Sequence, residues 1–167
     1  MHSSQTLKAV PDVTPPPGRL IAIDLGSKRV GVAVSDELRM TVTPLERIER
    51  RSWKDLLRRV AALIDDYDAR ALVIGLPLSL DGKENNAAQE AKRIAENFRK
   101  SLNVPVFLQD ERLTTAAAES ELRARGVRAS EVEKRIDSES AAIILRDFIA
   151  EQAPAEGVID LECGGKR

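Results

Sequence analysis

The first half of the folded region shows short apolar runs separated by polar turns, a pattern that predicts β-strands. Apolar runs cover residues 20–24 and 30–34, and the link between them is short and contains Gly26. Two strands joined by so short a link form an antiparallel hairpin. A third strand is predicted over 41–47, where Pro44 cannot donate a ladder hydrogen bond and therefore favours a sheet edge.

The second part of the pattern alternates between helices and strands. Ser52 is a suitable N-cap for an amphipathic helix, and the apolar run over 71–75 predicts a strand that is buried on both faces. An initial hairpin followed by strand–helix alternation predicts an α/β fold, with a mixed sheet and helices on both faces. The later elements are predicted as a helix from Asn85 or Asn86 to about Leu102, a strand over 104–109, a helix from Thr114 or Thr115 to about Arg125 and a last helix over 137–150.

The two ends of the chain lack this periodicity. Residues 1–18 are rich in proline and serine and are predicted to form a disordered leader, and residues 151–167 are predicted to form a flexible tail. One folded domain is therefore expected over 19–150, a normal size for a single hydrophobic core.

Composition narrows the possible chemistry. Aromatic residues make up 3% of the chain, so stacking of bases on aromatic side chains is a poor expectation. Lysine and arginine number 26 against 27 acidic residues, so a nucleic-acid site would have to be a local basic patch. The single histidine, His2, and the single cysteine, Cys163, lie near the two ends. Histidine and cysteine triads and zinc sites are thus excluded from the domain.

The expected location follows from related features. One cysteine cannot form an intramolecular disulfide, and no apolar run approaches the roughly 20 residues that a membrane span requires. The amino terminus also lacks the apolar core of a signal peptide. We therefore expect a cytoplasmic protein.

Acidic residues stand at the ends of three predicted elements. Asp24 ends the first strand at the sheet's rim, although an aspartate before Gly26 could simply initiate the turn. Asp110 and Glu111 end the last strand and point in opposite directions, and the residue pattern does not decide which one reaches a shared site. Asp137 lies on the core-facing stripe of the last helix, where its alternative role is that of a helix N-cap.

Convergence of three carboxylates at one rim would require a cation. Their mutual repulsion would raise their pKa values unless a divalent ion neutralised them. Mg²⁺, or Mn²⁺ in its place, suits a ligand set made only of oxygen atoms. Two such ions roughly 3.5–4 Å apart can promote phosphodiester hydrolysis without any histidine.

Four motifs resemble those of the YqgF/RuvX family and occur in the family's order. The resemblance spans about residues 19–150 and implies a ribonuclease H-like fold with a five-stranded mixed sheet, related to the RuvC resolvases. It also selects Glu111 over Asp110, and implies that Asp24, Glu111 and Asp137 are the catalytic residues that bind the metal. The motifs are Ile23 to Ala33, Ile74 to Leu78 with Asp81-Gly82, Asp110 to Thr115, and Ile136 to Ala142.

The resemblance also implies an activity. Members of this family are regarded as nucleases that mature the 5′ end of precursor 16S ribosomal RNA, and some are described as Holliday-junction resolvases. We therefore expect a metal-dependent nuclease that hydrolyses phosphodiester bonds during ribosome biogenesis. Precursor ribosomal RNA is the expected partner, and branched DNA, which would be cut in recombination and repair, is the alternative. The chain is expected to act as a monomer or a homodimer.

Two other classes of function compete with this hypothesis. Actin-like and sugar-kinase folds open with a comparable Asp-x-Gly turn, but they close two such domains around a nucleotide, and this chain supplies one. A non-catalytic RNA-binding assembly factor would keep the basic residues and not the activity. Metal-dependent cleavage by the purified protein separates that class from a nuclease.

Basic residues within and between the acidic motifs are predicted to contact nucleic-acid phosphates. Taken singly, those near 123–128 fit equally well a solvated helix end, where positive charge suits the helix dipole. Trp53 is predicted to pack against a helix rather than to stack on a base. The predicted nucleic-acid-binding set comprises Lys28, Arg29, Arg112, Arg123, Arg125, Arg128, Lys134 and Arg135.

Overall fold

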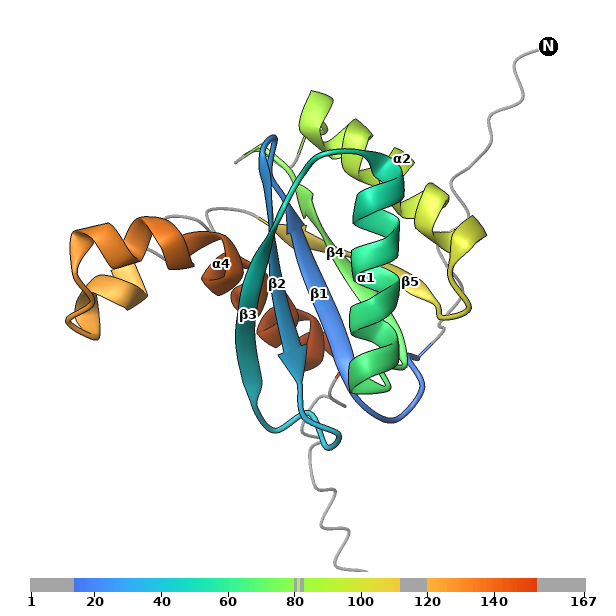
Figure 1. The fold of residues 1–167 in the computed structure, drawn as a ribbon, viewed down its shortest axis with the longest axis horizontal. Helices are drawn as coiled ribbons and strands as arrows, with labels where there is room; N and C mark the ends of the chain where they lie inside the picture. The colour runs from blue at the N-terminus through green and yellow to red at the C-terminus, as the bar shows by residue number, and fades with distance from the viewer. Residues whose placement is uncertain (1–13, 80, 82, 112–119, 153–167) are drawn as a thin grey trace, which may run out of the picture.

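A five-stranded mixed sheet forms the centre of the computed structural model (Figure 1). The structure describes residues 14–79, 81, 83–111 and 120–152, without the side chains of 129, 130, 133 and 134. The strand order is β3-β2-β1-β4-β5, in which β1–β2 and β2–β3 are antiparallel and β1–β4 and β4–β5 are parallel. The elements are β1 Leu20–Leu25, β2 Arg29–Ser35, β3 Val42–Glu49, α1 Trp53–Tyr67, β4 Ala71–Pro77, α2 Asn86–Ser101, β5 Val106–Glu111 and α4 Ala129–Gln152.

Local signals in the sequence set most of these boundaries. The Ser52 side chain caps α1 by accepting a hydrogen bond from the backbone N–H of Asp55, and Asn85 caps α2 in the same way. The third strand lies at the sheet edge, where Pro44 needs no partner for its missing N–H. The predicted α/β fold, with its hairpin, its edge strand and its later strand–helix alternation, is therefore confirmed.

Helices cover both faces of the sheet, and each face has its own core. On one face α1 and α2 pack on aliphatic side chains of the strands, and Trp53 meets Phe98 with ring centroids 4.8 Å apart. On the other face α4 packs with Ala141, Ile144 and Phe148, all buried. Trp53 is thus a packing residue, as predicted, and the stripe of α4 that continues Asp137 faces the sheet, also as predicted.

The last helix differs from the prediction at its beginning. It starts at Ala129, eight residues before the predicted start at Asp137. Figure 1 shows that this first part extends past β3, away from the sheet, so the sheet-facing stripe used for the prediction does not reach it. The N-cap interpretation of Asp137 is wrong, because Asp137 lies well inside the helix. We call residues 120–136 the arm, since helical residues 120–124 accompany the start of α4.

Other boundaries shift by a few residues. The last strand covers Val106–Glu111 and not 104–109, so Asp110 and Glu111 belong to the strand and pair with β4. The helix α4 ends at Gln152, two residues inside the predicted tail. Residues 1–13 of the predicted leader, the remaining tail residues, and the start of the helix predicted from Thr114 or Thr115 lie outside the described residues. Within the described part of the chain, no helix combines the length and apolar character needed to cross a bilayer.

The backbone of α4 crosses β2 at Gly31. A Cβ atom at this glycine would lie 1.8 Å from the carbonyl oxygen of Asp137. One residue along the strand, the N–H of Val32 donates to the hydroxyl of Ser138 at 3.3 Å. Only a residue without a side chain allows so close an approach of two backbones, and this approach places Asp137 against the sheet.

Gly31→Ala is therefore predicted to destabilise the fold. The added methyl group would force α4 away from β2, and crowding of this kind typically costs about 1–3 kcal/mol or more in the free energy of unfolding. Urea unfolding followed by circular dichroism measures the loss. Ser138→Ala is the matched control, because it removes the acceptor of the buried Val32 N–H without crowding the two backbones. That loss is about 1–3 kcal/mol, and the loss in Gly31→Ala should be larger. A Gly31→Ala variant as stable as the wild type would contradict the close approach.

Candidate active site

Asp24 lies near the end of the central strand β1, between two glycines of the neighbouring strands. In the antiparallel pairing it is in register with Gly31 of β2. In the parallel pairing Ile23 is in register with Ile74, which brings the next residue of β4, Gly75, beside Asp24. Because neither glycine has a side chain, the space next to Asp24 is open to side chains from β5 and α4.

Glu111 uses the space above Gly75. A Cβ atom at Gly75 would lie 2.0 Å from Oε2 of Glu111 and 2.6 Å from the terminal methyl of Ile144. The Glu111 side chain thus reaches back from β5 across β4 and forms a hydrogen bond with Asp24. Asp110, which points the other way along the strand, is exposed. The structure thereby brings Glu111, and not Asp110, to Asp24, a choice that the alternation of the strand had left open.

The environment of Asp24 disfavours its charged form. Burial raises the pKa of the Asp24 carboxyl to about 8, assisted by repulsion from Glu111, by the hydrogen bond to Glu111 and by repulsion from Asp137. A carboxyl group with these neighbours must keep a proton or gain a cation. Both neighbouring carboxylates, Glu111 and Asp137, belong to the three predicted catalytic residues.

Asp137 lies close to this pair but is held by two arginines. Its Oδ2 is 3.5 Å from Nε of Arg29 and 3.6 Å from Nη1 of Arg47, at the start of β2 and near the end of β3. The same oxygen is buried and accepts no hydrogen bond. This carboxylate oxygen thus has positively charged neighbours but no hydrogen-bond donor, which leaves it free to act as a ligand to a metal ion.

Two arginines near the site were missed by the sequence reasoning. Arg47 contacts Asp137, and Arg50 ties down the β1–β2 turn, since it donates to the carbonyl of Gly26 at 2.8 Å and to Glu90 Oε1 at 2.6 Å. Both lie at the end of β3 or just after it, a segment considered only for its strand pattern. Their spacing carries no motif, and only the sheet order brings them to the site.

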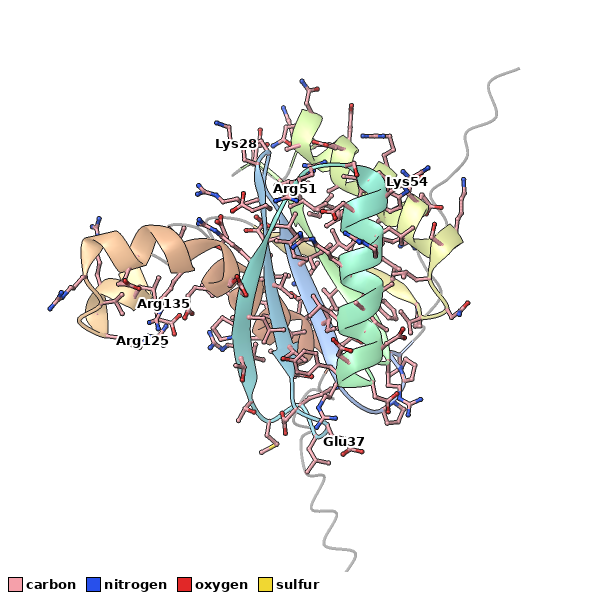
Figure 2. The ribbon with its side chains drawn as sticks, in the orientation of Figure 1. Lys28, Glu37, Arg51, Lys54, Arg125 and Arg135 are labelled. Carbon is pink, nitrogen blue, oxygen red and sulfur yellow. The ribbon has the colours of Figure 1, made fainter. Side chains whose placement is uncertain are left out.

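The predicted basic residues divide into two groups. Lys28 and Arg29 lie at the β1–β2 turn beside the carboxylates, and Figure 2 shows Lys28 at the tip of this hairpin. The others with described side chains lie on the arm, beyond β3, where Arg125 forms an ion pair of 2.8 Å with Glu139. Arg112 and the side chain of Lys134 lie outside the described residues. The arm residues described are Arg123, Arg125, Arg128 and Arg135.

The donor set has the chemistry of a site for a hard divalent cation, although its three carboxylates do not lie close together. Among the described residues, no group of three acidic, histidine or cysteine side chains stands close enough to hold a metal ion. Asp137 is the member turned aside, toward its arginines. Two half-buried carboxylates close to each other and a third with an unsatisfied oxygen supply the ligands that Mg²⁺ or Mn²⁺ prefers.

Comparison with known proteins gives a match over the folded part of the chain. The family described as RuvX, Holliday junction resolvase, matches residues 18–151. A protein of Roseiflexus sp. (strain RS-1), named "Putative pre-16S rRNA nuclease", is 40% identical over 136 residues, which cover 81% of this chain and 96% of the relative. A protein of Mycolicibacterium paratuberculosis with the same name is 41% identical over 146 residues, or 87% of each chain.

Solved structures agree on the fold. The crystal structure of Fowlpox virus resolvase with Holliday junction DNA aligns with a TM-score of 0.50 and 12% identity, covering 81% of this chain and 99% of that one. At this identity the likeness concerns the architecture alone. The expected five-stranded ribonuclease H-like fold and the resemblance found in the four motifs are confirmed.

Asp24→Asn is predicted to change how stability depends on pH when no metal is bound. The folded protein keeps a proton on Asp24 up to about pH 8, whereas the unfolded chain releases it near 3.8. Stability should therefore fall as pH rises through this window. The variant has no carboxylate to desolvate, so its melting temperature in EDTA at pH 8 should exceed that of the wild type by more than about 3 °C.

Thermal unfolding from pH 5 to 8.5, with a chelator present, measures this difference. Asp110→Asn is the matched control, because it neutralises an exposed carboxylate on the strand that carries Glu111. It should follow the wild-type curve. Identical curves for Asp24→Asn and wild type would show that Asp24 is not held in a buried acidic pair.

Proposed function

This chain belongs to the RuvX family, and on that basis we propose that it is a metal-dependent nuclease whose catalytic residues are Asp24, Glu111 and Asp137. The observation that carries the proposal is the burial of Asp24 against Glu111, with Asp137 near enough to repel it. Such an arrangement costs stability unless a cation offsets the charge. A site that is unfavourable without a ligand is typical of a functional centre.

The cation that fits these ligands is Mg²⁺ or Mn²⁺. Divalent ions in oxygen-ligand sites make a water molecule more acidic and stabilise charge on the leaving oxygen of a phosphodiester. Asp24 and Glu111 would hold the ion from β1 and β5, the two strands on either side of β4, and Asp137 would complete the ligand set from α4. The chain's one histidine, His2, lies outside the domain, so the carboxylates themselves must position the attacking water.

The arginines around Asp137 have a separate role. Arg29 and Arg47 approach Oδ2 of Asp137 from two strands and keep its charge partly neutralised inside the protein. Arg50 fixes the turn that follows Asp24 through the carbonyl of Gly26. These contacts support a preorganised site, in which the ligands need little rearrangement beyond that of Asp137.

Precursor 16S ribosomal RNA is the proposed substrate. Two relatives at about 40% identity carry the name of a pre-16S rRNA nuclease. A resolvase must make two symmetric cuts and therefore needs a stable dimer. The scarcity of aromatic residues also leaves few side chains that could wedge open stacked base pairs at a junction. The family's description as Holliday junction resolvases makes branched DNA the alternative substrate.

Removal of any one carboxylate is predicted to abolish cleavage while leaving the fold intact. Asp24→Asn, Glu111→Gln and Asp137→Asn should each reduce single-turnover cleavage at least about 100-fold, because each removes a ligand and its charge. Calorimetric titration with Mn²⁺ should show weakened binding in the same variants. Asp110→Asn, the exposed neighbour of Glu111, is the control and should cleave at the wild-type rate.

Two results would overturn parts of this proposal. Wild-type turnover by Asp137→Asn at saturating Mg²⁺ would remove Asp137 from the ligand set. A wild-type protein that binds RNA but cleaves neither RNA nor DNA with any divalent ion would leave a non-catalytic RNA-binding factor as the function.

Precursor ribosomal RNA is predicted to be cut faster than a four-way DNA junction under equal conditions. The measurement compares single-turnover rates on both substrates, with the molar mass in solution determined by light scattering. A stable dimer that cuts junctions symmetrically and spares RNA would instead support a resolvase.

A further inference from the structure

A basic groove of about 730 Å³ runs along the exposed edge of the sheet, between α1 and α4 with its arm. Its floor is the edge strand β3, from Thr43 to Glu49. Five arginines line it against three glutamates, so its net charge is positive. The arginines come from separate parts of the chain and comprise Arg47, Arg51, Arg59, Arg125 and Arg135.

Two of these arginines have charges that the described structure does not neutralise. Arg51 and Arg135 are exposed, and neither forms an ion pair with a described residue. By contrast, Arg125 is paired with Glu139 at 2.8 Å and Arg59 with Asp55 at 3.1 Å. Figure 2 shows Arg135 on the arm and Arg51 across β3 from it, so positive charge faces the groove from both walls.

The groove opens beside the carboxylates. Arg47 lines it and also lies 3.6 Å from Oδ2 of Asp137, and Ser138, the next residue of α4, belongs to its wall. The part of β3 from Thr43 to Glu49, of which six residues line the groove, extends over about 20 Å at roughly 3.3 Å per residue. A nucleic-acid strand that passes the carboxylates could therefore continue along β3 for several nucleotides.

Protection of the sheet edge would explain only part of this charge. Edge strands often carry charged residues and bulges that prevent pairing with another chain, and β3 has a register shift opposite Val30 and Val32. That role needs charge on the strand itself. It does not account for Arg51, just before α1, or for Arg135 on the arm.

We propose that this groove binds the phosphate backbone of the nucleic-acid strand on one side of the scissile bond. The proposal rests on the nuclease function and extends it, because it assigns Arg47, Arg51 and Arg59 to a substrate path that begins beside the turn carrying Lys28 and Arg29, next to Arg51, and runs along β3. Arginine side chains recognise phosphate through charge and paired N–H donors, and contacts of this kind hold a strand without reading its sequence.

The experiment measures RNA binding at increasing salt, with the full chain and no metal, so that nothing is cleaved. Fluorescence anisotropy with a labelled 20-nucleotide single-stranded RNA gives the affinity between 50 and 300 mM KCl. The test variant is the double substitution Arg51→Gln with Arg135→Gln. The control is Arg58→Gln with Arg70→Gln, which removes two arginines whose side chains are 76% and 53% exposed outside the groove.

The slope of log affinity against log salt should decrease by about 1.4 in the test variant, at about 0.7 for each lost phosphate contact on a single strand. The control should keep the wild-type slope. Equal slopes for test and control variants would overturn the groove proposal, even if the wild type proved to be a nuclease. A reduced slope in the test variant of a protein that never cleaves would uphold the groove and refute the nuclease function.

The same variants separate RNA from an acidic protein partner. A labelled 20-residue polyglutamate should bind the wild type more weakly than the RNA does. If the polyglutamate bound tightly and lost affinity on Arg51→Gln with Arg135→Gln, while RNA binding stayed unchanged, the groove would be a protein-binding site and the proposal would be wrong.

Discussion

Electrostatic repulsion between Asp24 and Glu111, inside a protein and next to Asp137, is the constraint around which the active edge of this fold is organised. Burial and these two neighbours hold the pKa of Asp24 near 8, far from its ordinary value of 3.8. A fold keeps such a pair only when something else offsets its cost. In the function that we propose, a bound divalent cation would do so, and the same cation would provide the means to hydrolyse a phosphodiester.

The backbone is shaped to make this contact possible. Gly31 lets α4 descend onto β2, and Gly75 leaves room for the Glu111 carboxylate above β4. Side chains at either position would separate the acidic groups by occupying the space between them. Arg29 and Arg47 then compensate Asp137 on the outer side. Since Arg47 also lines the groove along β3, the carboxylate site and the proposed path of the substrate share a residue.

Much of this organisation follows from the sequence. Short apolar runs, caps such as Ser52 and the edge preference of Pro44 predict the five strands and their order of appearance, because these signals are local. The stripe of α4 that faces the sheet follows from helical periodicity. The family motifs indicated Glu111, whereas the residue pattern alone could not, because Asp110 and Glu111 are adjacent in an apolar strand.

What the sequence could not predict depends on contacts between distant segments. The start of α4 extends away from the sheet, so no sheet-facing apolar stripe marks it in the sequence. The sequence therefore allowed Asp137 to be interpreted as an N-cap, whereas the helix begins at Ala129. The groove likewise unites arginines from β3, α1 and the arm, none of which form a motif. Such sites depend on strand order and helix placement, which become visible only in three dimensions.

The most direct test of the metal centre is anomalous diffraction from crystals soaked in Mn²⁺. The expected result is a manganese peak between the carboxylates of Asp24 and Glu111, with Asp137 turned from Arg47 toward the ion. Crystals in which Asp24 and Glu111 remained hydrogen-bonded to each other, with no manganese at this edge of the sheet and Asp137 still beside Arg29 and Arg47, would contradict it.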